Sequence, residues 1–295
     1  MKVYKPSGFF DTKGLIFTPF IVAIVSMFLA VYYARALWFC PIVYLGAALP
    51  VLYAMAVGYA SRWSVRKSNI RSPQLAKVLG TIGAIPGFYV SWAAWGGLTN
   101  NVTGQGTLNL GFKKFPIVDS FVSLSQALSQ ALHPFQLVQK VQEIAGVGLW
   151  SVEGFVVHGV FLYGVWILEA AIFFFFVGRR FSPIGAAPFS ERKFQWYPET
   201  KLTVPIALPT NVAGVEAFEA IEKGQVGALV NAREERSPES ASYLKVVLYY
   251  LEGAGDAYAT IYGYALTRGS SHKKKLLVKY VKVPEALGKT LSNKF

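Results

Sequence analysis

Two ionisable side chains in one long apolar stretch are the residues of this sequence best suited to chemistry. Glu169 lies well inside the stretch 154–177, and His158 lies nearer its outer end. If the stretch is helical, their separation of eleven positions, at about 100° per residue, brings both side chains to one face, about 16 Å apart along the axis. Leu162 and Val165 lie between them on that face. The spacing therefore predicts two separate polar groups and no continuous polar path.

Glu169 is expected to face the inside of a helix bundle or a cavity, because a carboxyl group inside a bilayer costs about 2.5–3.5 kcal/mol or more. Judged by depth in the membrane, Tyr53, Ser26 or Thr81 could donate a hydrogen bond to it. Two interpretations stay open. Glu169 could handle protons or ions, or it could fix the pairing of helices within the protein or with a partner subunit. We favour the second.

Known catalytic and metal-binding patterns are missing from the sequence. One cysteine, Cys40, excludes an intrachain disulfide and a cysteine-based zinc or iron–sulfur site, and the three histidines lie far apart. The segment 288–290 (Gly-Lys-Thr) resembles the end of a phosphate-binding loop, but Val283 stands where its first glycine should be. We also expect too few residues after it to form a helix. The sequence therefore predicts that the protein is not an enzyme. It also predicts no catalytic residue, no metal and no cofactor.

The composition is typical of a membrane protein. Of the 295 residues, 53% are hydrophobic and 15% are charged, against about 25% charged in a typical soluble domain. This excludes a disordered chain and argues against a single soluble globule. The 29 Lys and Arg outnumber the 16 Asp and Glu, for a net charge of +13. A net positive charge of this size suggests nucleic acid as a partner. In a membrane protein the same charge also arises from the Lys and Arg that set the orientation of the spans.

Four apolar stretches are long enough to cross a bilayer as helices, which takes about 20 residues. They cover residues 14–33, 37–59, 78–98 and 154–177. The glycines and Pro86 of the third stretch could make it broken or re-entrant. Only residues 34–36 join the first two stretches. This predicts a tight antiparallel hairpin with interfacial aromatic side chains at its end, those of Tyr32, Tyr33 and Trp38.

Lysine and arginine predict the orientation of these spans. Asp11 is the only acid on the side that carries ten basic residues: Lys2, Lys5, Lys13, Arg62, Arg66, Lys67, Arg71, Lys77, Arg179 and Arg180. We expect this side to be cytoplasmic, with both termini inside, in a bacterial inner membrane. The cluster at 62–77 could bind nucleic acid or anionic lipid. We favour a topology determinant that contacts lipid headgroups, and expect no nucleic acid.

The outer region, 99–153, is expected to begin with a turn-like stretch at 99–112 and to continue with two short amphipathic helices. Their apolar stripes would be Phe121, Leu124, Leu128 and Leu132, then Leu137, Val138, Val141 and Ile144. These helices could lie on the outer leaflet, bind a partner protein or cap the bundle. We favour the cap.

A linker at 181–190 precedes a small soluble domain at 191–295, where charged residues become frequent. A helix is expected at 211–223. Beyond it, an antiparallel meander of three strands is predicted at 243–251, 257–267 and 276–283, with turns at 253–256 and 269–275. In the middle strand, small residues alternate with three tyrosines that we take as a candidate docking surface: Tyr258, Tyr262 and Tyr264. The small face could sit against a helix, and the tyrosine face could bind a partner or lie buried.

The predicted fold class is an α-helical polytopic membrane bundle of four spans followed by a small soluble α+β domain with an antiparallel three-strand meander. We expect a non-catalytic membrane subunit or scaffold of a multiprotein complex, for example in secretion, conjugative transfer or envelope assembly, with a cytoplasmic docking domain. The alternative is a small-solute or ion-coupled transport component that uses Glu169. A membrane-embedded enzyme with an unfamiliar site is a third class. Expected partners are the lipid bilayer, other membrane or cytoplasmic subunits, and a second copy of the chain.

Overall fold

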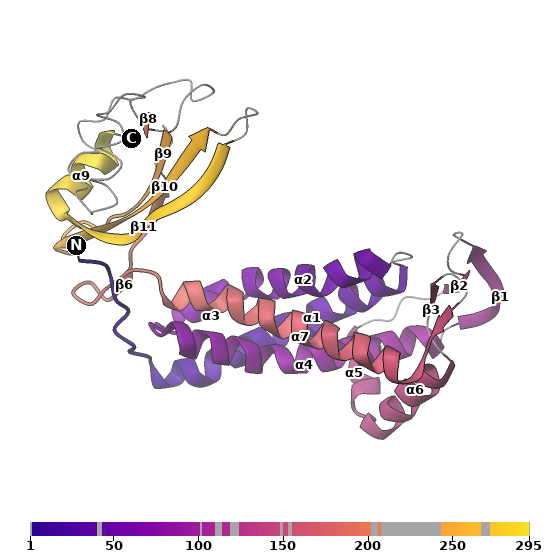
Figure 1. Cartoon of the computed structure of the whole chain (residues 1–295). Coiled ribbons are helices and arrows are strands. Elements are labelled where there is room, and N and C mark those ends of the chain that lie inside the picture. Colours follow the sequence, from indigo (N-terminus) through magenta and orange to yellow (C-terminus); the bar gives the residue numbers. More distant parts are fainter. Residues whose placement is uncertain are drawn as a thin grey trace. The chain divides into compact units, whose positions relative to one another are not determined.

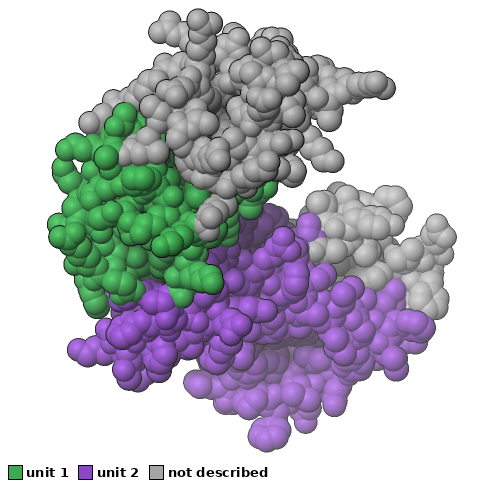
Figure 2. All heavy atoms as spheres, turned by 60° about the vertical axis from the view of Figure 1, so that its left-hand side comes forward, with its two compact units in different colours: residues 1–6, 187–295 green, residues 7–186 purple. Residues whose placement is uncertain are grey.

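Figure 1 shows the computed structural model of the chain, in which long helices and small antiparallel sheets alternate. The residues that the structure describes are 2–39, 43–100, 102–109, 114–118, 124–147, 150–152, 155–201, 206–207, 243–266 and 272–294. The helix expected at 211–223 lies outside them. Two compact units divide the chain: residues 7–186 form one, and residues 1–6 together with 187–295 form the other (Figure 2). The first six residues thus belong with the C-terminal unit, although the sequence placed them with the membrane part.

Four long helices dominate the unit 7–186: α1 (Thr12–Phe39), α2 (Val43–Ala60), α4 (Pro73–Asn100) and α7 (Gly159–Gly185). Among the residues that the structure describes, three segments are long and apolar enough to cross a membrane: Thr12–Leu37, Pro73–Gly97 and Gly159–Gly185. These correspond to the first, third and fourth predicted spans, and α4 continues unbroken through Pro86. The second predicted span also folds as a helix, α2, which is the shortest of the four.

The predicted connection at 34–36 is wrong, because α1 continues through these residues to Phe39, although α1 and α2 do pack against each other. The extra helical turns also change the environment of the two tyrosines that were expected at the membrane interface. The side chain of Tyr33 is only 6% exposed, whereas that of Tyr32 is 56% exposed. One of the two is therefore a core residue.

The long helices form a ring in which α1 and α7 each pack against both α2 and α4. Close approach of α1 and α4 depends on two glycines one turn apart in α4. A Cβ added at Gly87 would lie 2.3 Å from the side chain of Ser26, and one at Gly83 would lie 2.7 Å from the carbonyl oxygen of Pro19. Small residues at this spacing let helix backbones approach closely in a membrane. A short helix, α3 (Arg62–Lys67), follows α2 at one end of the ring.

At the other end of the ring, helices α5 (Leu124–Ala131) and α6 (Pro134–Val147) pack on α4. The predicted stripe of α5 is rotated: Ala127 is fully buried and Ala131 packs against the bundle core, while Leu128 and Leu132 are exposed. The Tyr89 hydroxyl donates a hydrogen bond of 2.8 Å to the Ala131 carbonyl oxygen. These contacts agree with a cap on the bundle.

Two strand hairpins flank these helices. The first pairs β1 (Val102–Asn109) with β2 (Lys114–Val118), and the second pairs β3 (Trp150–Val152) with β4 (Phe155–Val157). Most of the stretch expected to be turn-like at 99–112 is therefore strand.

The C-terminal unit is built on an antiparallel sheet with the order β11-β10-β9-β7, and β8 also pairs with β9. Its strands are β7 (Glu199–Lys201), β8 (Ile206–Ala207), β9 (Tyr243–Tyr249), β10 (Asp256–Leu266) and β11 (His272–Pro284). The predicted three-strand meander is present. The second turn is shorter than expected, because residues 272–275 belong to β11 and pair with 263–266. A small hairpin of β5 (Phe189–Ser190) and β6 (Gln195–Trp196) precedes the sheet.

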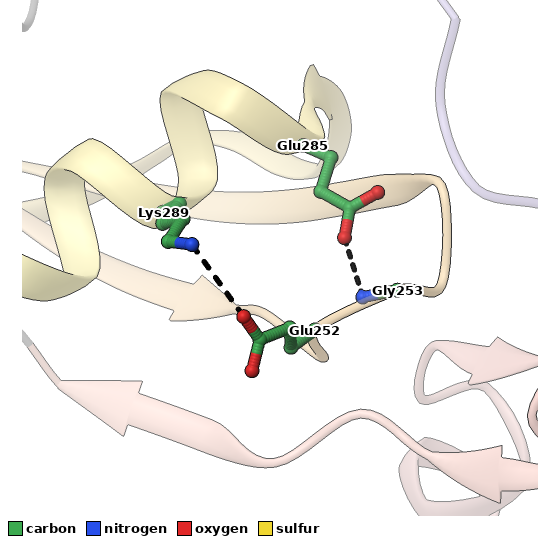
Figure 3. A network of polar contacts seen from close by, with 4 residues as sticks. All are labelled: Glu252, Gly253, Glu285 and Lys289. Atoms are coloured by element: carbon green, nitrogen blue, oxygen red, sulfur yellow. Dashed lines mark hydrogen bonds and ion pairs between the residues drawn. The ribbon is translucent and has the colours of Figure 1, made fainter.

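Helix α9 (Glu285–Lys294) follows β11 directly and covers one face of the sheet. The expectation that no helix could form here is wrong. A Cβ added at Gly288 would lie 2.7 Å from the Cβ of Ala257, so α9 sits closely against the small face of β10. The carboxylate of Glu285 accepts a hydrogen bond of 2.5 Å from the backbone N–H of Gly253 (Figure 3). It also accepts one of 2.9 Å from the backbone N–H of Gly255, and both bonds hold the β9–β10 turn to the start of α9.

Residues 2–4 add a short strand to the free edge of β11. Val3 forms an antiparallel bridge with Val281. The N–H of Tyr4 donates to the carbonyl oxygen of Tyr280, and the N–H of Lys282 donates to that of Lys2, both at 2.9 Å. The two ends of the chain therefore meet in one sheet.

Candidate functional site

A hydrogen bond between Tyr33 and Glu169 lies in the core of the helix ring. The Tyr33 hydroxyl on α1 donates to Oε1 of Glu169 on α7. Because α1 and α7 are not neighbours in the ring, this bond links two helices that otherwise meet through α2 and α4. Glu169 is half-buried. The predicted donors to Glu169, which were Tyr53, Ser26 and Thr81, are therefore wrong.

Next to this bond, four aromatic rings form a stack with one ring from each long helix. The Tyr33 and Tyr53 rings lie 4.6 Å apart between centroids, Tyr53 and Phe173 also lie 4.6 Å apart, and Phe173 and Phe88 lie 5.3 Å apart. The interplanar angles are between 16° and 23°. Stacked rings contribute roughly 0.5–1.5 kcal/mol per pair beyond their burial. The stack therefore ties the four helices together at one level.

Polar groups of the stack bond to the backbone of neighbouring helices. The Tyr53 hydroxyl donates a hydrogen bond of 2.8 Å to the carbonyl oxygen of Ser26. The Ser26 hydroxyl donates to the carbonyl oxygens of Ala23 (3.0 Å) and Gly83 (3.4 Å). Two of the three predicted donors to Glu169, Tyr53 and Ser26, thus donate their hydroxyl hydrogens to backbone carbonyl oxygens instead. Tyr33 was missed because its helix was expected to end there.

His158 does not join this cluster. It is exposed and precedes the first residue of α7, with an extended backbone (φ −140°, ψ 172°). The argument that His158 and Glu169 share a helix face needs both residues in the helix, so that prediction is wrong. Leu162, which lies between them, is fully buried. In the described part of the chain no group of three His, Cys, Asp or Glu side chains could hold a metal ion.

The carboxyl group and the phenol can do one of two things chemically. Glu169 can accept the hydrogen bond from the Tyr33 hydroxyl as a fixed contact that sets the positions of α1 and α7. A carboxyl group paired with a hydroxyl group can also take up and release a proton, because each oxygen acts as a donor or an acceptor. The ring stack against Tyr33 favours the fixed contact, since it leaves the phenol little freedom to move.

The predicted basic cluster gathers at one end of the ring, where α2 and α7 end and α4 begins. Arg66 is half-buried, and the exposed members are Arg62, Lys67, Lys77, Arg179 and Arg180. Arg71 differs, because its side chain is only 1% exposed. The Arg71 guanidinium lies 4.7 Å above the ring of Phe9, and the backbone N–H of Arg71 donates a hydrogen bond of 2.9 Å to the Phe9 carbonyl oxygen. Arg71 therefore packs against the N-terminal segment at Phe9 and is not a surface contact to lipid headgroups.

The tyrosine face of the sheet is partly covered by other aromatic side chains. The Tyr258 ring meets Tyr4 at 5.2 Å and Tyr197 at 5.3 Å, both edge to face. Burial raises the pKa of Tyr197 to about 12 and also raises the pKa of Tyr258 above its ordinary value. Tyr258 is thus engaged within the unit.

The other two tyrosines of this face are half-buried beneath lysines. The ammonium group of Lys274 lies 4.2 Å from the ring of Tyr262, and that of Lys245 lies 5.2 Å from the ring of Tyr264. In the described structure, each of these two rings of the predicted docking surface therefore lies against a lysine ammonium group.

Comparison with models of protein families, with curated proteins and with solved structures gives no match for this chain. Function must therefore be argued from the site itself.

Proposed function

We propose that this protein is a non-catalytic membrane subunit or scaffold of a multiprotein complex, with the C-terminal unit as a cytoplasmic docking domain. The observation that carries the proposal is the hydrogen bond from Tyr33 to Glu169 within the four-ring stack. An acid held this way serves helix pairing, the structural use of a polar group in a membrane. Tyr262 and Tyr264 are the docking residues of the proposal. Its bacterial inner-membrane location rests on the sequence alone.

The proposal gives the chain four spans, with both termini on the same side of the membrane. The support for a shared side is the pairing of residues 2–4 with β11, which joins the start and the end of the chain in one sheet. A chain whose ends share one side crosses an even number of times. Helix α2, which packs between α1 and α7, then supplies the fourth crossing. The basic end of the ring makes that side cytoplasmic.

A transport component that uses Glu169 is the second candidate. It is favoured by the pairing of a carboxyl group with a phenol inside the bundle, because such a pair can exchange a proton. The two candidates differ in whether Glu169 must ionise.

Two substitutions at Glu169 separate them. Glu169→Gln keeps an oxygen that accepts the Tyr33 hydrogen bond but cannot ionise, whereas Glu169→Leu removes the acceptor. For a scaffold we expect Glu169→Gln to elute from native membranes in mild detergent as the same complex as the unchanged protein, and Glu169→Leu to lose partner subunits. Size-exclusion chromatography with mass spectrometry of the full complex measures this. Glu143→Gln, an exposed acid on α6, is the control.

Proton uptake by proteoliposomes containing the full chain gives the opposing result. If Glu169→Gln assembles normally but abolishes a proton uptake that the unchanged protein shows, the scaffold proposal is wrong and the transport proposal stands. Recovery of the unchanged protein as a monomer without any partner also contradicts the scaffold.

A further inference from the structure

Three basic side chains at the end of α7 lack a counter-charge. Lys77, Arg179 and Arg180 are exposed, and within the described residues no hydrogen bond or ion pair holds any of them. Asp11, the single acid among residues 1–98, lies beside the start of α1, the helix across the ring from α7. These cations therefore form a strongly positive surface that the unit itself does not neutralise.

Glycines on neighbouring helices fix the stems of two of these side chains. A Cβ added at Gly178 of α7 would lie 3.0 Å from both Cγ and Cε of Lys77, so the lysine stem runs along α7. A Cβ added at Gly58 of α2 would lie 2.6 Å from the Cβ of Arg180. Each stem fills the space that a side chain larger than glycine would occupy at position 178 or 58. The positions of Lys77 and Arg180 at the surface are thereby restricted.

Helix geometry places the three cations around the outward side of α7. Successive residues are about 100° apart, so Gly178 and Arg180 point about 200° apart and Arg179 lies between them. Val177 and Phe181 on the remaining side are fully buried in the bundle. Arg179 therefore points away from the core, with Lys77 on one flank of α7 and Arg180 on the other.

An apolar track continues along the same side of α7. Phe175 and Leu168 precede Arg179 by four and eleven residues, which are spacings that keep one helix face. Their side chains are 58% and 60% exposed. This surface of α7 has cations that can bind a phosphate and, farther along the helix, exposed apolar side chains that can contact acyl chains. These are the two features that an anionic phospholipid site needs.

We propose that one anionic phospholipid binds here, with its phosphate among Lys77, Arg179 and Arg180 and its acyl chains along Phe175 and Leu168. The guanidinium groups match phosphate in geometry as well as in charge. This site is separate from the Tyr33–Glu169 pair and does not depend on the function proposed above.

Native mass spectrometry of the full chain in detergent tests the proposal. Phosphatidylglycerol is titrated against phosphatidylcholine with the same acyl chains, and we expect phosphatidylglycerol to be retained in preference. A basic side chain near a membrane surface contributes about fivefold to the binding of anionic lipid. Arg179→Gln, Lys77→Gln and Arg180→Gln should therefore each weaken phosphatidylglycerol binding about fivefold. Arg179→Lys keeps the charge but loses the guanidinium geometry, so it should weaken binding less than Arg179→Gln does.

Lys67→Gln is the matched control, because it removes one positive charge from the same end of the ring. The next residue, Ser68, packs against Gly14 and bonds to Thr18 on α1, across the ring from α7. We expect this variant to bind phosphatidylglycerol like the unchanged protein. An equal loss in Lys67→Gln and Arg179→Gln would overturn the proposal in favour of a general charge effect. Displacement of the lipid by inorganic phosphate at equal concentration would overturn it in favour of a simple anion site.

Discussion

One hydrogen bond and one stacked ring fix Tyr33 in the core of the helix bundle. Hydrogen bonds between membrane helices contribute about 0.6 kcal/mol on average and about 1.7 kcal/mol at most, because side chains in the unfolded membrane state also find partners. The Tyr33–Glu169 bond joins helices that are not neighbours in the ring. Its loss should therefore loosen the bundle without preventing the helices from forming.

We predict that Tyr33→Phe, which keeps the ring stack but removes the donor, lowers the stability of the bundle by about 1 kcal/mol. Thermal unfolding of the detergent-purified protein, followed by circular dichroism, measures the change. Tyr32→Phe is the control, because this neighbouring ring lies on the exposed side of the same helix. Equal losses in the two variants would show that the hydrogen bond to Glu169 contributes nothing.

Helix α9 and the β9–β10 turn depend on each other. Gly253 and Gly255 adopt positive φ angles of 70° and 87°, which turns their N–H groups toward the carboxylate of Glu285 at the start of α9. The second contact between these elements is an exposed ion pair of 3.5 Å from Lys289 to Glu252 (Figure 3). The first contact replaces water with two charge-assisted hydrogen bonds, and the second remains hydrated.

Glu285→Ala should lower the stability of the C-terminal unit by about 1–2 kcal/mol, because hydrogen bonds to a charged group contribute more than neutral ones. Glu252→Ala should cost less than about 0.5 kcal/mol, as is usual for an exposed ion pair. Hydrogen exchange of the Gly253 and Gly255 amides in the full chain reports both changes. A larger loss of protection in Glu252→Ala than in Glu285→Ala would contradict this assignment.

The chain passes between its two units twice, after residue 6 and after residue 186. The first passage exists only because residues 2–4 pair with β11. This strand also covers backbone groups of β11 that would otherwise form an open sheet edge, a common site of aggregation. The N-terminal segment is thus part of a unit whose other residues are 187–295.

Proline at position 4 tests this pairing. Tyr4→Pro removes the N–H that donates to the Tyr280 carbonyl oxygen, which should release the terminal strand from β11. The Lys282 amide, which donates to Lys2, should then exchange its hydrogen about tenfold faster, the equivalent of about 1.4 kcal/mol. Val3→Pro is the matched control, because no hydrogen bond from the Val3 amide exists in the described structure. Hydrogen exchange of residues 278–283 is the measurement. Unchanged exchange in Tyr4→Pro would show that the terminal strand does not protect β11.

Local patterns in the sequence were enough to predict three long apolar helices and the meander at 243–283. Alternation of large and small residues in one strand, or a run of apolar residues, is a property of neighbouring positions and can be read without knowing the fold. The small side chains on one face of β10 also suggested that this face could sit against a helix. The position of that helix could not be predicted, because the polar segment 285–294 has a weak signal of its own and packs through Gly288 against Ala257.

Contacts between distant residues were decided by the tertiary structure alone. Helix α1 runs past residue 33, and that extension places the Tyr33 hydroxyl against Glu169. Helix α7 begins after His158, which removes this side chain from the helix face that its spacing suggested. The sequence by itself determined where polar and basic side chains lie along the chain. Which of them meet depends on helix ends and on close packing at glycines, and these are set by the whole fold.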